Sequence, residues 1–262
     1  MNLTQAIYKR QSVRSYKMSS LSTEQMQAVR QAIAAAKPLY PHIPTTIDII
    51  EDGLALSGKS IISGYGNVKS PHYLAAASGT GDGHLENAGF ILEQAVLAMT
   101  EMGIGTCWVG TFTGSRIKGL LPTPLPAGQK GIIAIAFGEP ADMGELEPKA
   151  LSKRKRIPLE EMVIAEEPLS DRAREIYELV LAHPSAVNAQ KTRFFHKGKE
   201  AAVYMGSTLY KNINRIDAGI ALAHLDLACQ ERGIGCAIAP HEAGAPPKRM
   251  TYIAHARFDE EL

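Results

Sequence analysis

The chain has 262 residues, of which 45% are hydrophobic and 21% charged, and its formal net charge is +1. This is the composition of a soluble globular protein that can bury a sizeable core, in one large domain or in two closely associated halves. Charge this balanced excludes a general attraction to nucleic acid or acidic membranes, and no run approaches the roughly 18 apolar residues of a membrane span. Small molecules are therefore the expected partners.

The first half of the chain predicts helices and strands in alternation. Helices are expected at 3–11, 24–36 and 86–103. Ser22 and Gln25 form a capping box before the second helix, and Pro38 ends it. The third helix is apolar at most positions, which indicates a buried central helix. Short apolar runs predict strands at 46–50, 73–78 and 131–139.

The second half repeats this alternation after a basic run. Lys153, Arg154, Lys155 and Arg156 precede a helix that is capped by Ser170 and stops at Pro184. A strand at 199–206, a second long apolar helix and a strand at 250–258 follow.

Cysteine usage and the first residues bear on location. Cys107, Cys229 and Cys236 are odd in number and lie in apolar surroundings, which favours buried reduced thiols over a disulfide framework. The segment MNLTQAIYKRQSVRSY lacks the apolar core of a signal peptide. We therefore expect a cytoplasmic protein.

The two long apolar helices are similar in sequence. A shift of 130 residues aligns NAGFILEQAVLAMTEMGIG with DAGIALAHLDLACQERGIG without a gap, and nine positions are identical, among them Gly89 with Gly219. A shared apolar period explains some of the matching leucines and alanines. The full set predicts an internal duplication, with residues 1–163 and 164–262 as interlocked halves related by a pseudo-twofold axis, like a dimer fused into one chain. We expect such a chain to be a monomer.

Two basic clusters could bind an anion. In an extended backbone, Arg10, Ser12 and Arg14 would point to one side and offer two guanidiniums and a hydroxyl group. The basic run 153–156 could converge on the same anion. Solvated surface loops are the alternative interpretation of both clusters.

Two further segments could contact a ligand ring. PSAVNAQ places Ser185, Asn188 and Gln190 after a helix end, where their polar groups could bind the edge of a heteroaromatic ring. Glycines around Trp108 allow the backbone of GIGTCWVG to approach a ligand closely. A solvated helix end and simple glycine turns are the respective alternatives.

Together these segments resemble the nitroreductase family of FMN enzymes. The family's Arg-x-Ser-x-Arg, Gly-x-Gly-Thr-Cys-Trp-like loop, basic-Pro-Leu-Glu-Glu and Pro-Ser-x-x-Asn-x-Gln motifs occur in order at 10–14, 103–108, 153–161 and 184–190. The resemblance implies an α+β fold with a mixed, mostly antiparallel sheet flanked by helices. Family members are homodimers with FMN at the interface, so this chain resembles a single-chain tandem pseudo-dimer.

The resemblance also implies roles for individual residues. Arg10 and Ser12 would hold the phosphate and ribityl end of FMN, with charge from Arg154 and Arg156, and Arg14 would tune the ring near N1 and O2. The remaining ring contacts would come from Trp108, Val109, Gly110, Thr111, Pro184, Ser185, Asn188 and Gln190. NAD(P)H would reduce the flavin, which would then reduce a small acceptor such as a nitroaromatic or quinone in a ping-pong scheme without a catalytic side chain.

The chain departs from the family pattern in its first half. His42 and Pro44 stand where the asparagine and glutamine of the Pro-Ser-x-x-Asn-x-Gln motif are expected, and the second half has no Arg-x-Ser-x-Arg. One FMN per chain is therefore expected. A flavin- or nucleotide-binding protein without turnover is the alternative function.

Other motifs are weaker. GLALSGKS at 53–60 satisfies the Walker A pattern, but Gly64, Gly66 and Pro71 follow where a helix should begin at the lysine. The glycine pairs lack the context of a Rossmann fingerprint, and the histidines and cysteines have no zinc spacing. Neither an NTPase nor a metal site is expected.

Overall fold

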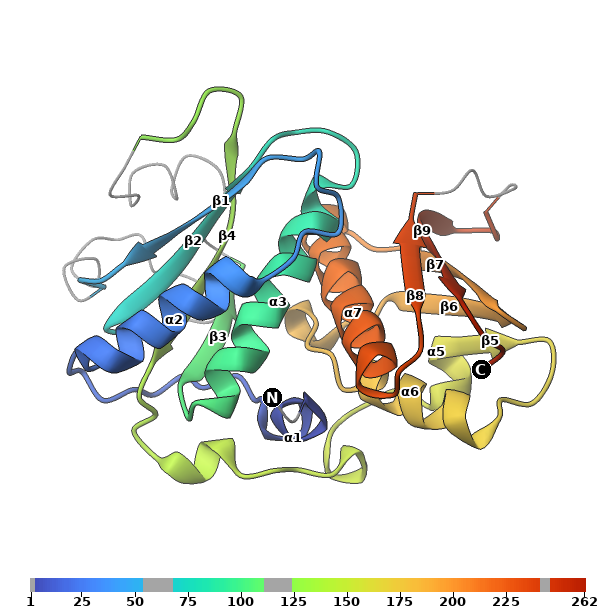
Figure 1. Cartoon of the computed structure of the whole chain (residues 1–262), viewed down its shortest axis with the longest axis horizontal. Coiled ribbons are helices and arrows are strands. Elements are labelled where there is room, and N and C mark those ends of the chain that lie inside the picture. Colours follow the sequence, from blue (N-terminus) through green and yellow to red (C-terminus); the bar gives the residue numbers. More distant parts are fainter. Residues whose placement is uncertain (1–2, 54–67, 111–123, 241–245) are drawn as a thin grey trace. The chain divides into compact units, whose positions relative to one another are not determined.

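The computed structural model describes residues 3–53, 68–110, 124–240 and 246–262 (Figure 1). The chain forms two compact units. Unit 1 consists of Met1–Lys37, Pro41–His84 and Gln94–Pro148, and unit 2 of Pro38–Tyr40, Leu85–Glu93 and Lys149–Leu262. Helix α3 (His84–Glu101) therefore contributes residues to both units.

The core of unit 1 is an antiparallel sheet with strand order β1-β2-β4-β3. Its strands are β1 (Thr45–Ile50), β2 (His72–Ser78), β3 (Gly105–Val109) and β4 (Lys130–Gly138). Every residue of β2 is buried, and all of β4 except Lys130, because both strands lie in the middle of the sheet. The three strands predicted from apolar runs are confirmed, and β3 is an addition.

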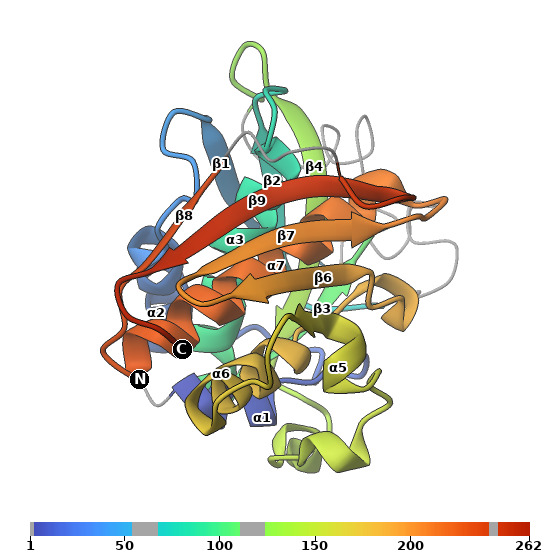
Figure 2. The same ribbon diagram turned by 90° about the vertical axis from the view of Figure 1, so that its right-hand side faces the viewer.

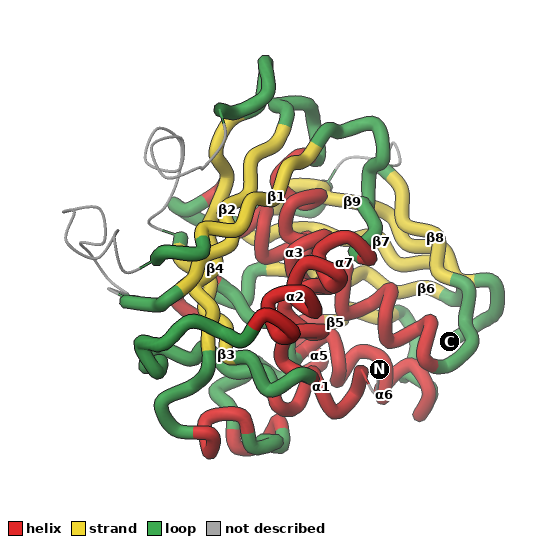
Figure 3. The backbone as a smooth tube through the Cα atoms, turned by 60° about the vertical axis from the view of Figure 1, so that its left-hand side comes forward, coloured by secondary structure: helices red, strands yellow, loops and turns green. Residues whose placement is uncertain are grey.

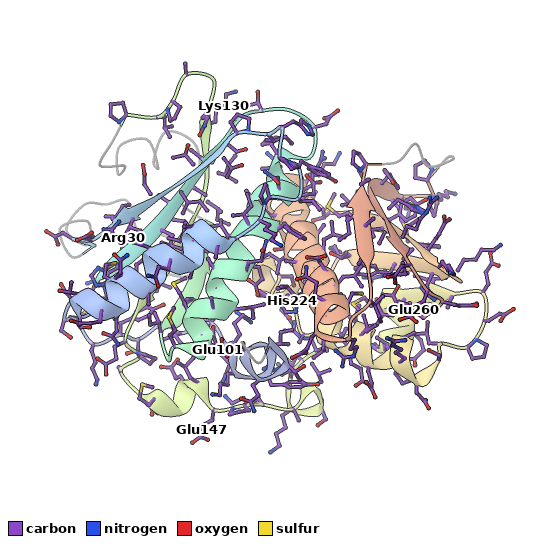
Figure 4. All side chains as sticks on the ribbon, viewed as in Figure 1. Arg30, Glu101, Lys130, Glu147, His224 and Glu260 are labelled. Atoms are coloured by element: carbon purple, nitrogen blue, oxygen red, sulfur yellow. The ribbon has the colours of Figure 1, made fainter. Side chains whose placement is uncertain are left out.

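Helices α1 (Leu3–Lys9) and α2 (Thr23–Ala35) precede this sheet in the chain. Ser22 accepts a hydrogen bond from Gln25 N, and the Gln25 side chain accepts one from Ser22 N, so the predicted capping box is confirmed. Arg30 of α2, labelled in Figure 4, pairs with Glu51, which follows β1.

Unit 2 contains a five-stranded sheet with order β5-β6-β7-β9-β8 (Figure 2). Its strands are β5 (Val163–Ala165), β6 (Thr192–Lys197), β7 (Glu200–Gly206), β8 (Cys236–Ala239) and β9 (Met250–Phe258). Only the β5–β6 pair is parallel. The expected α+β fold with largely antiparallel strands is therefore confirmed.

The helices of unit 2 are α5 (Leu159–Met162), α6 (Asp171–Leu181) and α7 (Lys211–Glu231). Ser170 caps α6 by accepting a hydrogen bond from Ala173 N, as predicted. Helix α7 packs on β6 and β7 and against α6, and most of its residues from Ile216 onward are buried. None of the described helices is long and apolar enough to cross a membrane.

Figure 3 shows α3 beside α7. Within unit 2, Gly89 and Gly219 let the backbones of these two helices approach closely. A Cβ atom on Gly89 would collide with the backbone oxygen of Ile216, and one on Gly219 would collide with that of Glu86. The contact is reciprocal, because a shift of 130 residues converts Glu86 and Gly89 into Ile216 and Gly219. Reciprocal contacts are what a local twofold axis between two helices produces.

The two sheets also share a strand order. The chain order β1, β2, α3, β3, β4 in the first half corresponds to β6, β7, α7, β8, β9 in the second. The spatial orders β1-β2-β4-β3 and β6-β7-β9-β8 match under this correspondence. These facts support an internal duplication, which stays a prediction together with the boundary between residues 163 and 164.

Candidate functional site

The segment Arg10–Arg14 lies along the outer edge of β3 in unit 1. Ser12 forms a parallel bridge with Thr106, and Val13 N donates to Thr106 O at 3.0 Å. Val13 is fully buried, so alternation in extended backbone directs Ser12 and Arg14 away from that core position. Arg10 N still donates to Ala6 O at the end of α1, so the expected extended backbone does not include Arg10.

Arg10, Ser12 and Arg14 all influence the pKa of the buried Cys107 thiol. Burial raises the pKa of Cys107, whereas the positive charges of Arg14 and Arg10 and a hydrogen bond with Ser12 act to lower it. Arg10 is itself buried, with 5% of its surface exposed, and Arg14 is exposed. Arg14 Nη1 donates to Ser12 O at 3.3 Å within the same segment. The segment thus carries two guanidiniums and a hydroxyl group, the groups that an anion clamp uses.

Thr106 adds an unsatisfied group at the same place. Its side chain is 1% exposed, and no described residue offers a hydrogen-bond partner to its Oγ1 atom. Buried hydroxyl groups are rarely left unpaired in folded proteins. An additional hydrogen-bonding group next to Ser12 would satisfy this atom.

The segment from Trp108 to Gly110 ends β3. Trp108 and Gly110 are half-buried and Val109 is buried, while Thr111 lies outside the described residues. Local structure explains why glycines occupy positions 103 and 105, before this segment. Gly103 has a φ of 78°, and a Cβ on Gly105 would lie 2.9 Å from Val13. The turn interpretation is therefore confirmed for Gly103, and Gly105 makes room for Val13.

In unit 2 the turn from Pro184 to Gln190 has an unusual backbone. Val187, Asn188 and Gln190 have φ values of 48°, 56° and 47°. Non-glycine residues rarely adopt this left-handed region, and each such residue costs on the order of 1–3 kcal/mol. The surrounding structure must therefore hold the turn in place.

Residues of the basic run 153–156 help to hold the Pro184–Gln190 turn in place. Arg156 donates from Nη1 to Asn188 Oδ1 at 2.9 Å and from Nη2 to Ala182 O at 3.0 Å. Asn188 in turn donates from Nδ2 to Lys155 O at 2.9 Å. Arg156 and Asn188 are thus brought together, and both help to fix the turn.

Gln190 and Ser185 make similar contacts. The Gln190 side chain is buried, accepts a hydrogen bond from Ile157 N at 3.0 Å and donates to Lys155 O at 3.3 Å. Its backbone N donates to Ser185 Oγ at 3.0 Å. The turn is therefore more than a solvated helix end. Arg154 lies farther back in the run, where its Nε donates to Lys149 O at 3.2 Å.

Asp217 of α7 is not among the residues predicted from the sequence. It is 4% exposed, and both carboxylate oxygens lie 3.1 Å from Ala186 N, inside the turn. Burial raises the pKa of Asp217 to about 7, although hydrogen bonds from Asn214 and Ala186 N act to lower it. The available signal was an acidic residue at the beginning of the apolar stretch Ala218–Ala223 of α7.

The predicted residues thus form one group in each unit. Unit 1 holds Arg10, Ser12, Arg14, Trp108, Val109 and Gly110, and unit 2 holds Arg154, Arg156, Pro184, Ser185, Asn188 and Gln190. That both groups bind one flavin stays a prediction. Residues 54–60 of the Walker A pattern lie outside the described residues.

A family model described as "Putative TM nitroreductase" matches residues 2–229. The chain belongs to this nitroreductase family. Among curated proteins, none matches the sequence significantly.

Solved nitroreductase structures are similar in fold. The crystal structure of a putative nitroreductase from Thermotoga maritima is 22% identical and has a TM-score of 0.65, with 98% of this chain and 93% of that chain covered. A nitroreductase with bound FMN from Bacteroides fragilis is 16% identical with a TM-score of 0.47, and the match covers 60% of this chain and 98% of that chain. At 22% identity, the comparison with the Thermotoga protein shows that this chain has the nitroreductase fold.

Proposed function

We propose that the protein is an FMN-dependent oxidoreductase that passes two electrons from NADH or NADPH to a small acceptor such as a nitroaromatic or a quinone. The observation that carries this proposal is the position of the Arg10–Arg14 segment along β3, beside the unsatisfied hydroxyl group of Thr106, in a chain that belongs to a nitroreductase family. The family supplies the class of reaction, and the local chemistry supplies a place for an anionic cofactor.

The residues of unit 1 fit the phosphate and ribityl end of FMN. Arg10 offers a buried guanidinium group, which binds phosphate more strongly than an exposed one because water competes less. Ser12 and its bridge partner Thr106, whose Oγ1 atom is unsatisfied, offer two hydroxyl groups from adjacent segments. We assign Arg10 and Ser12 to the phosphate and the ribityl chain.

The same unit would hold the ring. Arg14 is assigned to the N1 and O2 edge, where its positive charge would stabilise negative charge on the ring. The backbone of Trp108, Val109, Gly110 and Thr111 is assigned to the N5 edge, with Gly110 or Thr111 as the N–H donor. The half-buried position of Trp108 and Gly110 is compatible with a ligand on that side.

The residues of unit 2 are assigned to the other side of the cofactor. Pro184, Ser185, Asn188 and Gln190 would present their turn to the ring, and Arg154 would add positive charge near the phosphate. Because Arg156 already binds Asn188 and Ala182, we assign it to holding the turn as well as to supplying charge.

When bound, FMN would supply hydride transfer at N5, which no amino-acid side chain can perform. The protein residues would bind the cofactor, orient the ring and exclude water. The nicotinamide donor and the acceptor would use one pocket in turn, in a ping-pong scheme. The chain would act as a monomer with an internal pseudo-dimer.

The test is the absorption spectrum of the purified protein, followed by anaerobic addition of NADH or NADPH. We expect one FMN per chain, bleaching of the flavin absorbance by a reduced nicotinamide, and steady oxidation of that nicotinamide when a nitroaromatic or quinone is added. Failure to bind added FMN would refute the proposal. A bound flavin that neither nicotinamide reduces would favour a binding protein without turnover, and two FMN per chain would contradict the single site.

A further inference from the structure

The carboxylate of Asp217, a residue of α7, anchors the Pro184–Gln190 turn. Besides the contacts of both oxygens with Ala186 N, Oδ2 accepts a hydrogen bond from Asn214 Nδ2 at 2.7 Å. Asn214 is 1% exposed and is held in turn by Thr208, whose hydroxyl donates to Asn214 Oδ1 at 2.6 Å. The carboxylate therefore has little freedom to move.

The first half of the chain contains the equivalent contact with a neutral residue. Asn87 of α3 occupies the position 130 residues before Asp217, and its Oδ1 accepts a hydrogen bond from Tyr40 N at 2.8 Å. Tyr40 stands two residues after Pro38, as Ala186 stands two residues after Pro184. Both long helices thus use the same position to hold the turn that follows the preceding helix.

The two turns differ in backbone conformation. None of the described residues from Pro38 to Pro44 has a positive φ, whereas Val187, Asn188 and Gln190 all do. The turn with the strained backbone is the one with the Pro-Ser-x-x-Asn-x-Gln residues, and it is the one with a carboxylate anchor. A buried carboxylate is costly, and its hydrogen bonds are stronger than those of an amide.

We propose that Asp217 is a positioning residue that holds the Pro184–Gln190 turn in the conformation required for flavin binding. This inference rests on the proposed function. The carboxylate fixes Ala186 N, and Ala186 is the first residue of the 3-10 turn that ends at Asn188. Without this anchor the strained residues relax, and Ser185, Asn188 and Gln190 lose their common orientation.

The experiment compares FMN binding by the full-length wild type with binding by Asp217→Ala, Asp217→Asn and the matched control Asn87→Ala, with quenching of flavin fluorescence as the readout. At a pH above 7, where Asp217 is charged, loss of its hydrogen bonds is expected to raise the Kd of Asp217→Ala about 10- to 100-fold. Asp217→Asn retains an acceptor for Ala186 N and should restore much of the affinity. Asn87→Ala should bind FMN with a Kd within about 3-fold of wild type, because Asn87 anchors the turn after Pro38, which lacks the Pro-Ser-x-x-Asn-x-Gln motif.

Amide hydrogen exchange of the apoprotein supplies a second readout that does not need flavin. The Ala186 amide should exchange at least about 10-fold faster in Asp217→Ala, while its rate in Asn87→Ala should match wild type. Wild-type exchange at Ala186, or wild-type affinity in Asp217→Ala, would overturn the inference. If the wild type itself binds no FMN, the proposed function fails first and the inference fails with it.

A second variant covers the case in which Asp217→Ala does not fold. Asn214→Ala removes the donor that holds Asp217 Oδ2 and changes no residue of the turn or the carboxylate itself. It should weaken FMN binding about 3- to 10-fold. Unchanged affinity in Asn214→Ala would then overturn the inference.

Discussion

His224 of α7 and Glu93 of α3 form a fully buried pair in unit 2, with His224 Nε2 3.0 Å from Glu93 Oε1. Figure 4 labels His224 on its helix. The other ring nitrogen, Nδ1, lies 2.9 Å from Leu179 O, and a carbonyl oxygen can only accept, so Nδ1 carries a proton. The histidine thereby connects α7 to both α3 and α6.

Removing one partner of this pair should destabilise the protein strongly. Glu93→Ala leaves His224 Nε2 buried without its partner, and we expect the free energy of unfolding in urea to fall by about 3–5 kcal/mol. Glu93→Gln should cost less than about 1.5 kcal/mol, because a glutamine amide can either accept a hydrogen bond from His224 Nε2 or donate one to it. Equal losses in the two variants would contradict this account.

The glycine crossing of α3 and α7 permits a second stability test. Gly89→Ala places a methyl group against the backbone oxygen of Ile216, which cannot move independently of its helix. We expect a loss of about 1–3 kcal/mol or more in urea unfolding. Gly81→Ala is the control, since no heavy atom lies within 4 Å of the added Cβ, and it should stay within about 0.5 kcal/mol of wild type.

Asp217 should make stability depend on pH. Burial raises its pKa from 3.8 to about 7, so the folded state binds more protons than the unfolded state between these values. Its contribution to the free energy of unfolding is fully present below pH 3.8 and is lost as the pH rises through 7. Relative to Asp217→Asn, the wild type should lose about 2–3 kcal/mol between about pH 5 and 8. A constant difference between the two proteins over this range would contradict the shift.

Arg10 should govern FMN affinity. Arg10→Ala removes the buried guanidinium assigned to the phosphate, and the Kd for FMN should rise about 10- to 100-fold in a fluorescence titration. Arg30→Ala is the matched control, because Arg30 is an exposed arginine of unit 1 that pairs with Glu51. Equal FMN affinity in the Arg10 variant and the control would argue against the phosphate assignment.

Arg14 should govern the rate of flavin reduction more than FMN affinity. In stopped-flow reduction by the preferred nicotinamide, Arg14→Ala should be slower by about 10-fold, a barrier increase of about 1.4 kcal/mol. Arg14→Lys keeps the positive charge and should be reduced at a rate closer to wild type. A lysine variant as slow as the alanine variant would show that charge is not the property that matters.

Continuous apolar elements could be predicted well from the sequence, and strands of mixed or glycine-containing composition could not. The 18 residues of α3 and the buried strand β2 carry strong periodic or continuous apolar signals. β6 (Thr192–Lys197) mixes aromatic and charged residues, and only its alternating burial in the structure marks it as a strand. β3 is five residues long and begins with a glycine, so it resembled a loop.

The candidate site shows a similar division. Arg10, Ser12 and Arg14 could be selected from their spacing, and the structure places their segment along β3, while their binding of FMN stays a prediction. Asp217 was not found, because its role depends on Ala186, which is 31 residues away. The contact of Arg156 with Asn188 spans 32 residues and was equally invisible in the sequence.

By itself, the sequence determined the family, the order of the motifs and the helices whose apolar faces demand burial, because these depend on residue type and local spacing. Only the tertiary structure decided which polar side chains form hydrogen bonds with the protein's own backbone. Such a bond depends on the distance and angle between segments that are far apart in the chain. The left-handed backbone of the Pro184–Gln190 turn is the clearest case. Val187 and Gln190 do not favour positive φ, and contacts from α7 and from residues 155–157 accompany that conformation.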